Sequence, residues 1–197
     1  MSKHRHEMSG TTLQKSWSGL PAGYTRLEYV TSNNAIQGYI DTEVIPETTE
    51  NIQIDIYKRD TIAPFGADNF AIAHSNFDEY WRVFNTNGAQ TGSSALYAWQ
   101  QYIYKDGYLS EPKKFGTQAV YSNGVKCWNN LYLFRRWSAE QFVNADISYC
   151  KIEKANGYVK ELIPAIRNSD GMVGMYDIAN NYFHVPPTGY LIAGPSL

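Results

Sequence analysis

Residues 162–195, LIPAIRNSDGMVGMYDIANNYFHVPPTGYLIAGP, decide the fold of this chain. Short apolar runs alternate here with pairs of turn-forming residues, Asp170-Gly171 and Asn180-Asn181. These residues tolerate the left-handed backbone of tight hairpins, which is why they stand between the apolar runs. We therefore predict a meander of short strands, whose runs are residues 162–166, 172–176, 182–183 and 190–193.

The same alternation of strands and turns continues through the rest of the chain. Residues 50–57 form the clearest predicted strand, because Ile52, Ile54 and Ile56 alternate with polar residues and give one buried and one polar face. The other main predictions are strands at 27–31, 36–42 and 131–134, a hairpin around Asn123-Gly124, and an antiparallel pair, 147–154 and 158–163. No segment has the pattern of an amphipathic helix of three turns. The sequence therefore predicts an all-β fold, an antiparallel β-sandwich or barrel, with a jelly roll as the natural choice.

The composition bounds the class of protein. The chain has 197 residues, enough for one domain, and 15% of them are aromatic, which suits pleated surfaces. A formal net charge of -2 argues against a nucleic-acid partner, because nucleic acids are held mainly by neutralising their phosphates. No run is long and apolar enough to span a bilayer, and no apolar segment follows the charges of MSKHRHEMSG. We therefore expect no membrane partner and no secretory signal.

Two cysteines, Cys127 and Cys150, are too few for a disulfide scaffold of this size. We favour two independent buried thiols over a disulfide between them. The cysteines and histidines show no metal-ligand spacing, so neither a metal nor a cofactor is predicted. The alternative is a calcium site that uses Asp68-Asn69 and Asp78-Glu79, although Asn and Asp also belong in turns for backbone reasons.

Residues 1–19 are polar, with Leu13 and Trp17 as the large apolar side chains apart from the methionines. Alone, such a segment buries too little surface to offset its ordering entropy. We predict an extended N-terminal arm, residues 1–19, ahead of a β-sandwich domain, residues 20–197. Leu13 and Trp17 are the predicted interface residues of the arm. It either lies on its own domain or inserts into a neighbouring subunit of an assembly, and we favour the second placement.

Both ends of the domain resemble one known family. LPAGYTRLEYV at 20–30 and YIDT at 39–42 resemble the opening phrases of concanavalin A-like, laminin-G-like domains of bacteriophage and gut-bacterial surface proteins. The closing phrases are similar to the end of that family, in the same order: NLYLF at 130–134, LIPA at 162–165, DGMVGMYD at 170–177 and GYLIAGP at 189–195. Residues 62–115 depart from the family pattern.

The resemblance implies a concanavalin A-like jelly roll of two antiparallel sheets, with a role in binding or virion architecture. We therefore expect a non-enzymatic structural or decoration protein of a bacteriophage virion, assembled in the host cytoplasm and associated with the head, a fibre or the tail. Its expected partners are other virion subunits in an oligomer, reached through the arm, and a glycan of the host surface. The alternative is a carbohydrate-binding adhesin module at a bacterial cell surface.

Sugar binding by aromatic stacking is the predicted chemistry of the site. The apolar faces of sugars pack on Trp and Tyr rings, while amides and carboxylates hold the hydroxyls. Residues 85–94, NTNGAQTGSS, form a polar, Gly-rich loop of the kind that carries binding function, and aromatic residues lie near it. The predicted ligand-binding residues are Trp81, Asn87, Tyr97, Trp99 and Tyr102. The alternative is that these rings fill the core or a subunit interface.

No catalytic residue is predicted. Glycan hydrolases of this fold need two carboxylates at alternate positions of one strand, so that both face the cleft. The nearest pairs here, Glu50 with Asp55 and Asp78 with Glu79, have odd spacings and point to opposite faces of a regular strand. No Gly-x-Ser-x-Gly phrase occurs, and we expect His74 and His184 to be ordinary strand or loop histidines.

Overall fold

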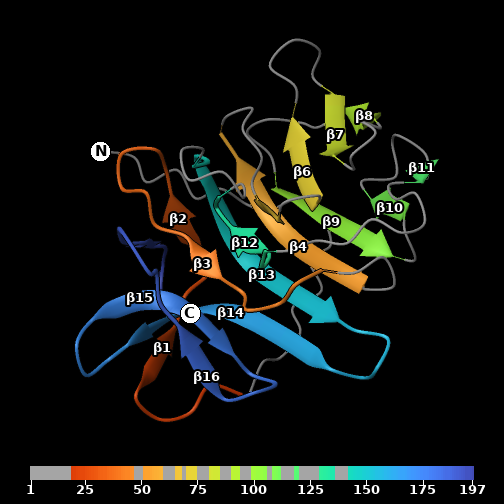
Figure 1. Ribbon diagram of the computed structural model, residues 1–197. Coiled ribbons are helices and arrows are strands. Elements are labelled where there is room, and N and C mark those ends of the chain that lie inside the picture. Colours follow the sequence, from red (N-terminus) through yellow and green to blue (C-terminus); the bar gives the residue numbers. More distant parts are fainter. Residues whose placement is uncertain are drawn as a thin grey trace.

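The computed structural model describes residues 19–46, 51–59, 129–135 and 142–197, together with the backbone of the strands between residues 65 and 119 and the side chains of Trp99, Gln101 and Ile103. In these parts of the chain the regular elements are all β-strands, and their pairs are antiparallel (Figure 1). The predicted all-β, antiparallel fold is therefore confirmed. The predicted hairpin at Asn123-Gly124 and residues 1–18 of the predicted arm lie outside the described residues.

The larger sheet has the central strand order β11-β10-β9-β4-β13-β14-β15-β16. Three short strands extend it, because β1 pairs with β14 and β2 pairs with both β13 and β17. The bounds are β1 Tyr24–Arg26, β2 Val30–Ser32, β4 Asn51–Lys58, β9 Trp99–Lys105, β10 Tyr108–Glu111, β11 Gln118–Ala119, β13 Ala145–Glu153, β14 Val159–Arg167, β15 Met172–Asp177, β16 Tyr182–His184 and β17 Ile192–Ala193.

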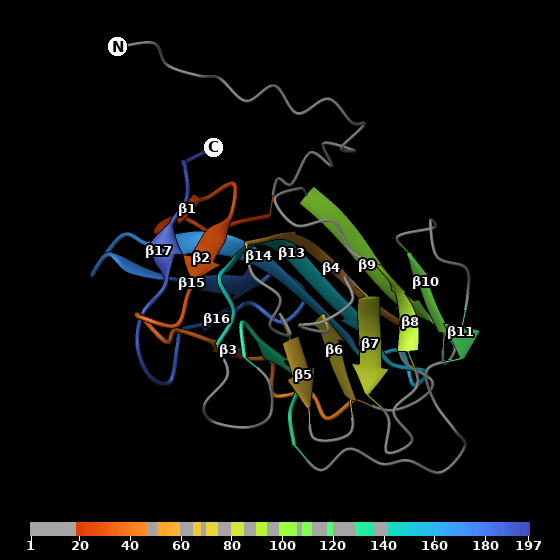
Figure 2. The same ribbon diagram turned by 90° about the horizontal axis from the view of Figure 1, so that it is seen from above.

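The smaller sheet has the order β3-β12-β5-β6-β7-β8 and lies against the central strands of the larger sheet (Figure 2). Its strands are β3 Ile40–Asp41, β5 Phe65–Ala67, β6 Phe70–His74, β7 Tyr80–Phe84, β8 Gln90–Ser93 and β12 Tyr132–Leu133. The arrangement of the described strands is sandwich-like.

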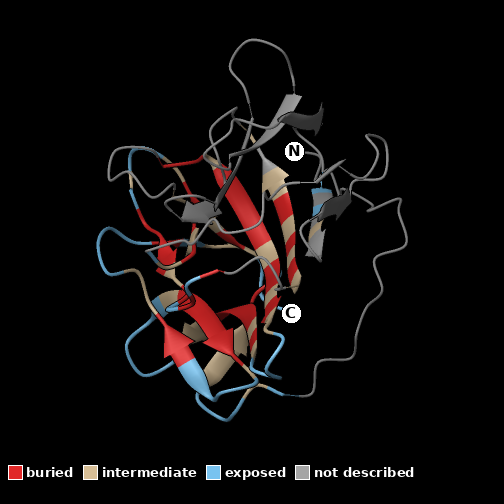
Figure 3. Ribbon diagram, turned by 45° about the vertical axis from the view of Figure 1, so that its right-hand side comes forward, coloured by how far each residue is buried: buried red, intermediate tan, exposed pale blue. Residues whose placement is uncertain are grey.

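The core lies between the two sheets. The three isoleucines of β4 (Ile52, Ile54 and Ile56) are at most 2% exposed, while the residues between them are half-buried, as predicted (Figure 3). They pack in one cluster with Ile40 of β3 and Leu133 of β12. Alternation along a single strand therefore decides which face of the larger sheet meets the smaller one.

The predicted C-terminal meander is present over its first three runs, β14, β15 and β16. Asp170 accepts a hydrogen bond from the backbone N–H of Met172 in the first turn, and Asp177 accepts one from that of Ala179 in the second. The last predicted run contains a strand, β17, but its place in the meander is wrong, because β17 pairs with β2. Pro186-Pro187 stands between β16 and β17 and cannot donate ladder hydrogen bonds, so the hairpin series stops there.

The two ends of the domain meet in the larger sheet. Tyr24 of β1 lies opposite Arg167 of β14, β2 pairs with β17, and Leu27 lies opposite Ser196. The strands predicted at 27–31 and 36–42 are shorter than expected, since only 30–32 and 40–41 are strand. Between them Asn33 accepts hydrogen bonds from the next turn of backbone, at Ala35 and Ile36, and interrupts the extended chain.

The outer face of the larger sheet is covered at one end by described residues. Over β14–β16, Ile163, Tyr176 and Phe183 form a second cluster under Leu20 and Tyr24. We call the part over β9, β4 and β13 the open face. Its outward positions are Trp99, Gln101, Ile103 and Lys105 on β9, Asn51, Gln53, Asp55 and Tyr57 on β4, and Asp146, Tyr149, Lys151 and Glu153 on β13. No helix in the described part of the chain is long and apolar enough to cross a membrane.

Candidate functional site

Three aromatic side chains gather at one end of the open face. Trp99 is the register partner of Tyr57, and its ring centroid lies 5.8 Å from the Tyr57 ring and 5.8 Å from the ring of Tyr29, which precedes β2. Tilted ring contacts at such distances are favourable. Trp99 is still 37% exposed, so this aromatic cluster presents ring surface to solvent.

An ion pair holds the aromatic cluster in place. Arg59 donates hydrogen bonds to both carboxylate oxygens of Asp146, at 2.6 and 2.5 Å, and the hydroxyl of Thr31 donates to the same carboxylate at 2.6 Å. Hydrogen bonding to Asp146 raises the pKa of Arg59. The guanidinium carbon lies 5.1 Å from the centroid of the Tyr57 ring. A bidentate pair of this kind fixes orientation, so the Tyr57 ring has little freedom to move.

The next row of the open face carries a carboxylate held by amides. Asp55 lies between Gln101 and Tyr149 in the register, and Gln101 Nε2 donates to Asp55 Oδ1 at 2.9 Å. Burial raises the pKa of Asp55, against the opposing effect of hydrogen bonds from Gln101 and Gln53. Tyr149 donates to Glu161 Oε1 at 2.7 Å, and burial followed by that bond raises the pKa of Tyr149. Carboxylate and amide groups therefore lie beside an aromatic cluster with one exposed ring, an arrangement suited to hydroxyl-bearing ligands.

A register shift in β13 brings this site together. Asp146 lies opposite Tyr57 and Tyr149 lies opposite Asp55, although they are three residues apart, because the register shifts at Ser148. On a regular strand, residues three apart point to opposite faces. The bulge therefore puts both side chains on the open face, a common use of bulges near functional sites.

Trp99 is the predicted ligand-binding residue whose side chain the structure describes, and it lies on the open face rather than in the core. The register pairs Tyr102 with Ile54, so position 102 belongs to the opposite face of β9. Trp81 lies in β7 of the smaller sheet. These three predicted positions therefore do not converge on one surface.

The remaining predicted positions lie outside the described residues. They are the ligand-binding residues Asn87 and Tyr97, the interface residues Leu13 and Trp17, the carboxylates Glu50, Asp78 and Glu79, and the calcium candidate Asp68-Asn69. The other residues of the site were not predicted as binding residues, and they are Tyr29, Asp55, Tyr57, Arg59, Gln101, Asp146 and Tyr149. Tyr57 could have been found from the sequence, because it is a large ring at an outward position of the alternating strand β4.

A second polar cluster is buried between the sheets. Lys160 is 3% exposed, and its Nζ donates to the carbonyl of Thr42 at 2.6 Å and lies 3.2 Å from Nε2 of His184. An ammonium has no acceptor, so Nε2 accepts. Burial first, and the charge of Lys160 second, lower the pKa of His184. His184 lies in a strand as predicted, and the cluster ties β14 and β16 to the segment after β3.

Cys150 is a buried free thiol, as favoured from the sequence, whereas Cys127 lies outside the described residues. Burial raises the pKa of Cys150, which makes it a poor nucleophile. Within the described part of the chain no group of three or more His, Cys, Asp or Glu side chains is placed to hold a metal ion. No protein-family model, curated protein or solved structure matches the chain.

Proposed function

We propose that this protein is a non-enzymatic glycan-binding protein with a concanavalin A-like jelly-roll fold, and that its ligand stacks on Trp99. The observation that carries the proposal is the cluster of the exposed Trp99 with the half-buried Tyr29 and Tyr57, beside Asp55 and its amide partner. Sugars present apolar C–H faces and polar hydroxyl edges. Rings next to carboxylate and amide groups match both kinds of surface.

The site is organised before a ligand arrives. Trp99 packs between two tyrosines, and the ion pair of Arg59 with Asp146 holds one of them. All of these side chains come from paired strands or their ends. Groups that are already fixed lose little conformational entropy on binding, so a weak ligand class such as a glycan gains usable affinity.

We further propose that the protein is a structural or decoration subunit of a bacteriophage virion and that its glycan site serves host attachment. This rests on the family-like phrases at the two ends of the domain, which lie side by side in the larger sheet. Residues 1–19 would contact other virion subunits through Leu13 and Trp17.

Replacing Trp99 with Ala tests the binding site. A ligand that covered the exposed 37% of this side chain would remove roughly 90 Å² from water, which is about 2 kcal/mol as an upper estimate. We expect a loss of affinity of up to about thirtyfold on an array of bacterial surface glycans. Tyr182→Ala is the matched control, because that ring is 53% exposed and lies on β16, away from the open face. A wild-type chain that binds no glycan, or a Trp99→Ala chain that binds as well as wild type, would refute the proposal.

The virion role has a separate test. Antibodies against the chain should label purified phage particles, and the isolated chain should form an oligomer in solution. A monodisperse monomer that is absent from purified particles removes this part of the proposal. Its presence in a bacterial cell-surface fraction instead would assign the same site to an adhesin.

A further inference from the structure

The open face continues well beyond the aromatic cluster, along β4. Outward positions follow one another from Tyr57 through Asp55 and Gln53 to Asn51, and each lies opposite an outward position of β13. At about 3.3 Å per residue, the strand from Tyr57 to Asn51 rises about 20 Å. A single sugar on the rings would leave most of this length uncovered.

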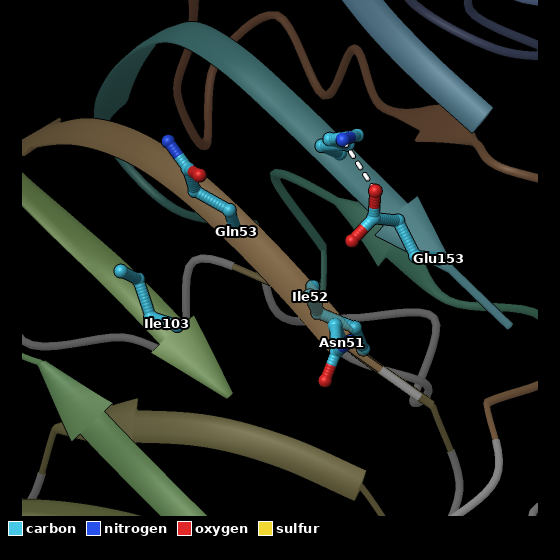
Figure 4. A pocket seen from close by; sticks show the side chains of 6 residues that line it. Asn51, Ile52, Gln53, Ile103 and Glu153 are labelled. Atoms are coloured by element: carbon cyan, nitrogen blue, oxygen red, sulfur yellow. Dashed lines mark ion pairs between the residues drawn. The ribbon is translucent and has the colours of Figure 1, made fainter. Parts of the chain in front are cut away.

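The far end of the face is hollowed. A shallow pocket of about 180 Å³ is lined by Gln53, Ile103, Lys151 and Glu153 with parts of Asn51 and Ile52. Figure 4 shows these side chains rising from three neighbouring strands, with the ion pair of Lys151 and Glu153 at one wall. The pocket thus offers an apolar group, an amide and a charged pair at a distance from the rings.

The charges on the face select the kind of ligand. Arg59 is bound to Asp146 and Lys151 to Glu153, so the two basic side chains that the structure describes on this surface have a carboxylate partner. Lys105 is a further outward position of β9, and its side chain lies outside the described residues. Asp55 adds a further carboxylate between them. An anionic ligand would meet carboxylates without a spare cation among the described residues, whereas neutral hydroxyls can donate to these oxygens.

We propose that the open face binds an elongated, uncharged oligosaccharide that lies along β4, from the aromatic cluster of Tyr29, Tyr57 and Trp99 to the pocket at Gln53 and Ile103. This inference rests on the glycan-binding function proposed above and adds the length and charge of the ligand. The aromatic cluster holds one end of the glycan, Asp55 and Gln101 accept and donate hydrogen bonds in the middle, and the pocket holds the other end.

The test uses the full chain and an array of neutral and acidic bacterial polysaccharides, each present as single sugars and as size-fractionated oligomers. Affinity should rise at least about tenfold from single sugars to long neutral oligomers. Ile103→Ala, which shortens an apolar side chain of the pocket, should weaken binding of long oligomers several-fold and leave short ones unchanged, whereas Trp99→Ala should weaken both. Glu28→Ala, at an exposed position outside the face, is the matched control.

The outcomes separate the two proposals. Single sugars that bind as tightly as long oligomers, or acidic oligomers that bind more tightly than neutral ones, overturn the elongated, uncharged ligand but leave glycan binding at Trp99 intact. Equal effects of Ile103→Ala on short and long oligomers also overturn it. Absence of binding to every probe refutes the glycan-binding function itself.

Discussion

Replacing His184 with Gln should remove a pH dependence from the stability of the fold. In the native protein Nε2 of His184 accepts from Nζ of Lys160 at 3.2 Å, so a proton on that nitrogen would bring two cations together in the core. The pKa of His184 therefore lies below its ordinary value of 6.5, with burial as the first cause and Lys160 as the second. Glu43 and Asp177 oppose this shift without reversing it.

The sign of the effect follows from which state binds the proton first. His184 is neutral in both states above the unfolded pKa, so it adds no pH dependence there. As the pH falls below the unfolded pKa, the His184 imidazole becomes protonated in the unfolded chain but stays neutral in the native state. The free energy of unfolding should then decrease by up to about 1.4 kcal/mol per pH unit until the folded pKa is reached.

Urea unfolding followed by tryptophan fluorescence, from about pH 8 to about pH 5, measures this dependence. The His184→Gln chain should lose less stability than wild type in the lower half of that range, and its amide oxygen can still accept from Lys160. Lys160→Met should flatten the wild-type dependence only in part, because burial of the imidazole remains. Parallel curves for wild type and His184→Gln would refute the reasoning.

Two further predictions concern the core and the junction of the chain ends. Ile54→Ala should lower the free energy of unfolding by about 2–5 kcal/mol in urea, because Ile54 is fully buried. Glu28→Ala, at an exposed position, should leave the unfolding midpoint unchanged. Equal midpoints for the two variants would contradict the assigned core face. Gly38→Ala should lower the free energy of unfolding by about 1–3 kcal/mol, because a Cβ there would overlap the carbonyl oxygen of Tyr190. Gly19→Ala is the control, since a Cβ at Gly19 meets nothing within 4 Å. An unchanged stability of Gly38→Ala would show that the two ends do not pack as described.

The parts of the fold that could be predicted are those encoded locally. The alternation of Ile52, Ile54 and Ile56 with polar neighbours fixes the faces of β4, and Asp170 and Asp177 act in their turns as expected. The partner of β17 could not be read in this way, because pairing between distant segments depends on the whole topology.

The candidate site was harder to predict than the fold because its geometry departs from simple alternation. In the buried cluster, Lys160 is two residues from Leu162, so alternation along the strand puts both side chains on the core face. The local sequence does not identify His184 as the acceptor of Lys160. Asp146 and Tyr149 have opposite parity, and only the bulge at Ser148 puts them on one surface. A sequence pattern carries no signal for that bulge.

The site lies on central strands and not at residues 85–94, which the sequence predicts as a polar binding loop but of which Gln90–Ser93 form β8. This position gives the site a precision that a loop would lack. β4 is paired along its length with β9 on one side and β13 on the other, and its inner residues anchor it in the core. Moving Tyr57 or Asp55 would therefore require moving buried isoleucines. Trp99 gains the same rigidity through its pairing with Tyr57. Sites built on strands hold their geometry better than sites on loops. The buried isoleucines of β4, which alternate with its outward residues, therefore also support the surface proposed to bind a glycan.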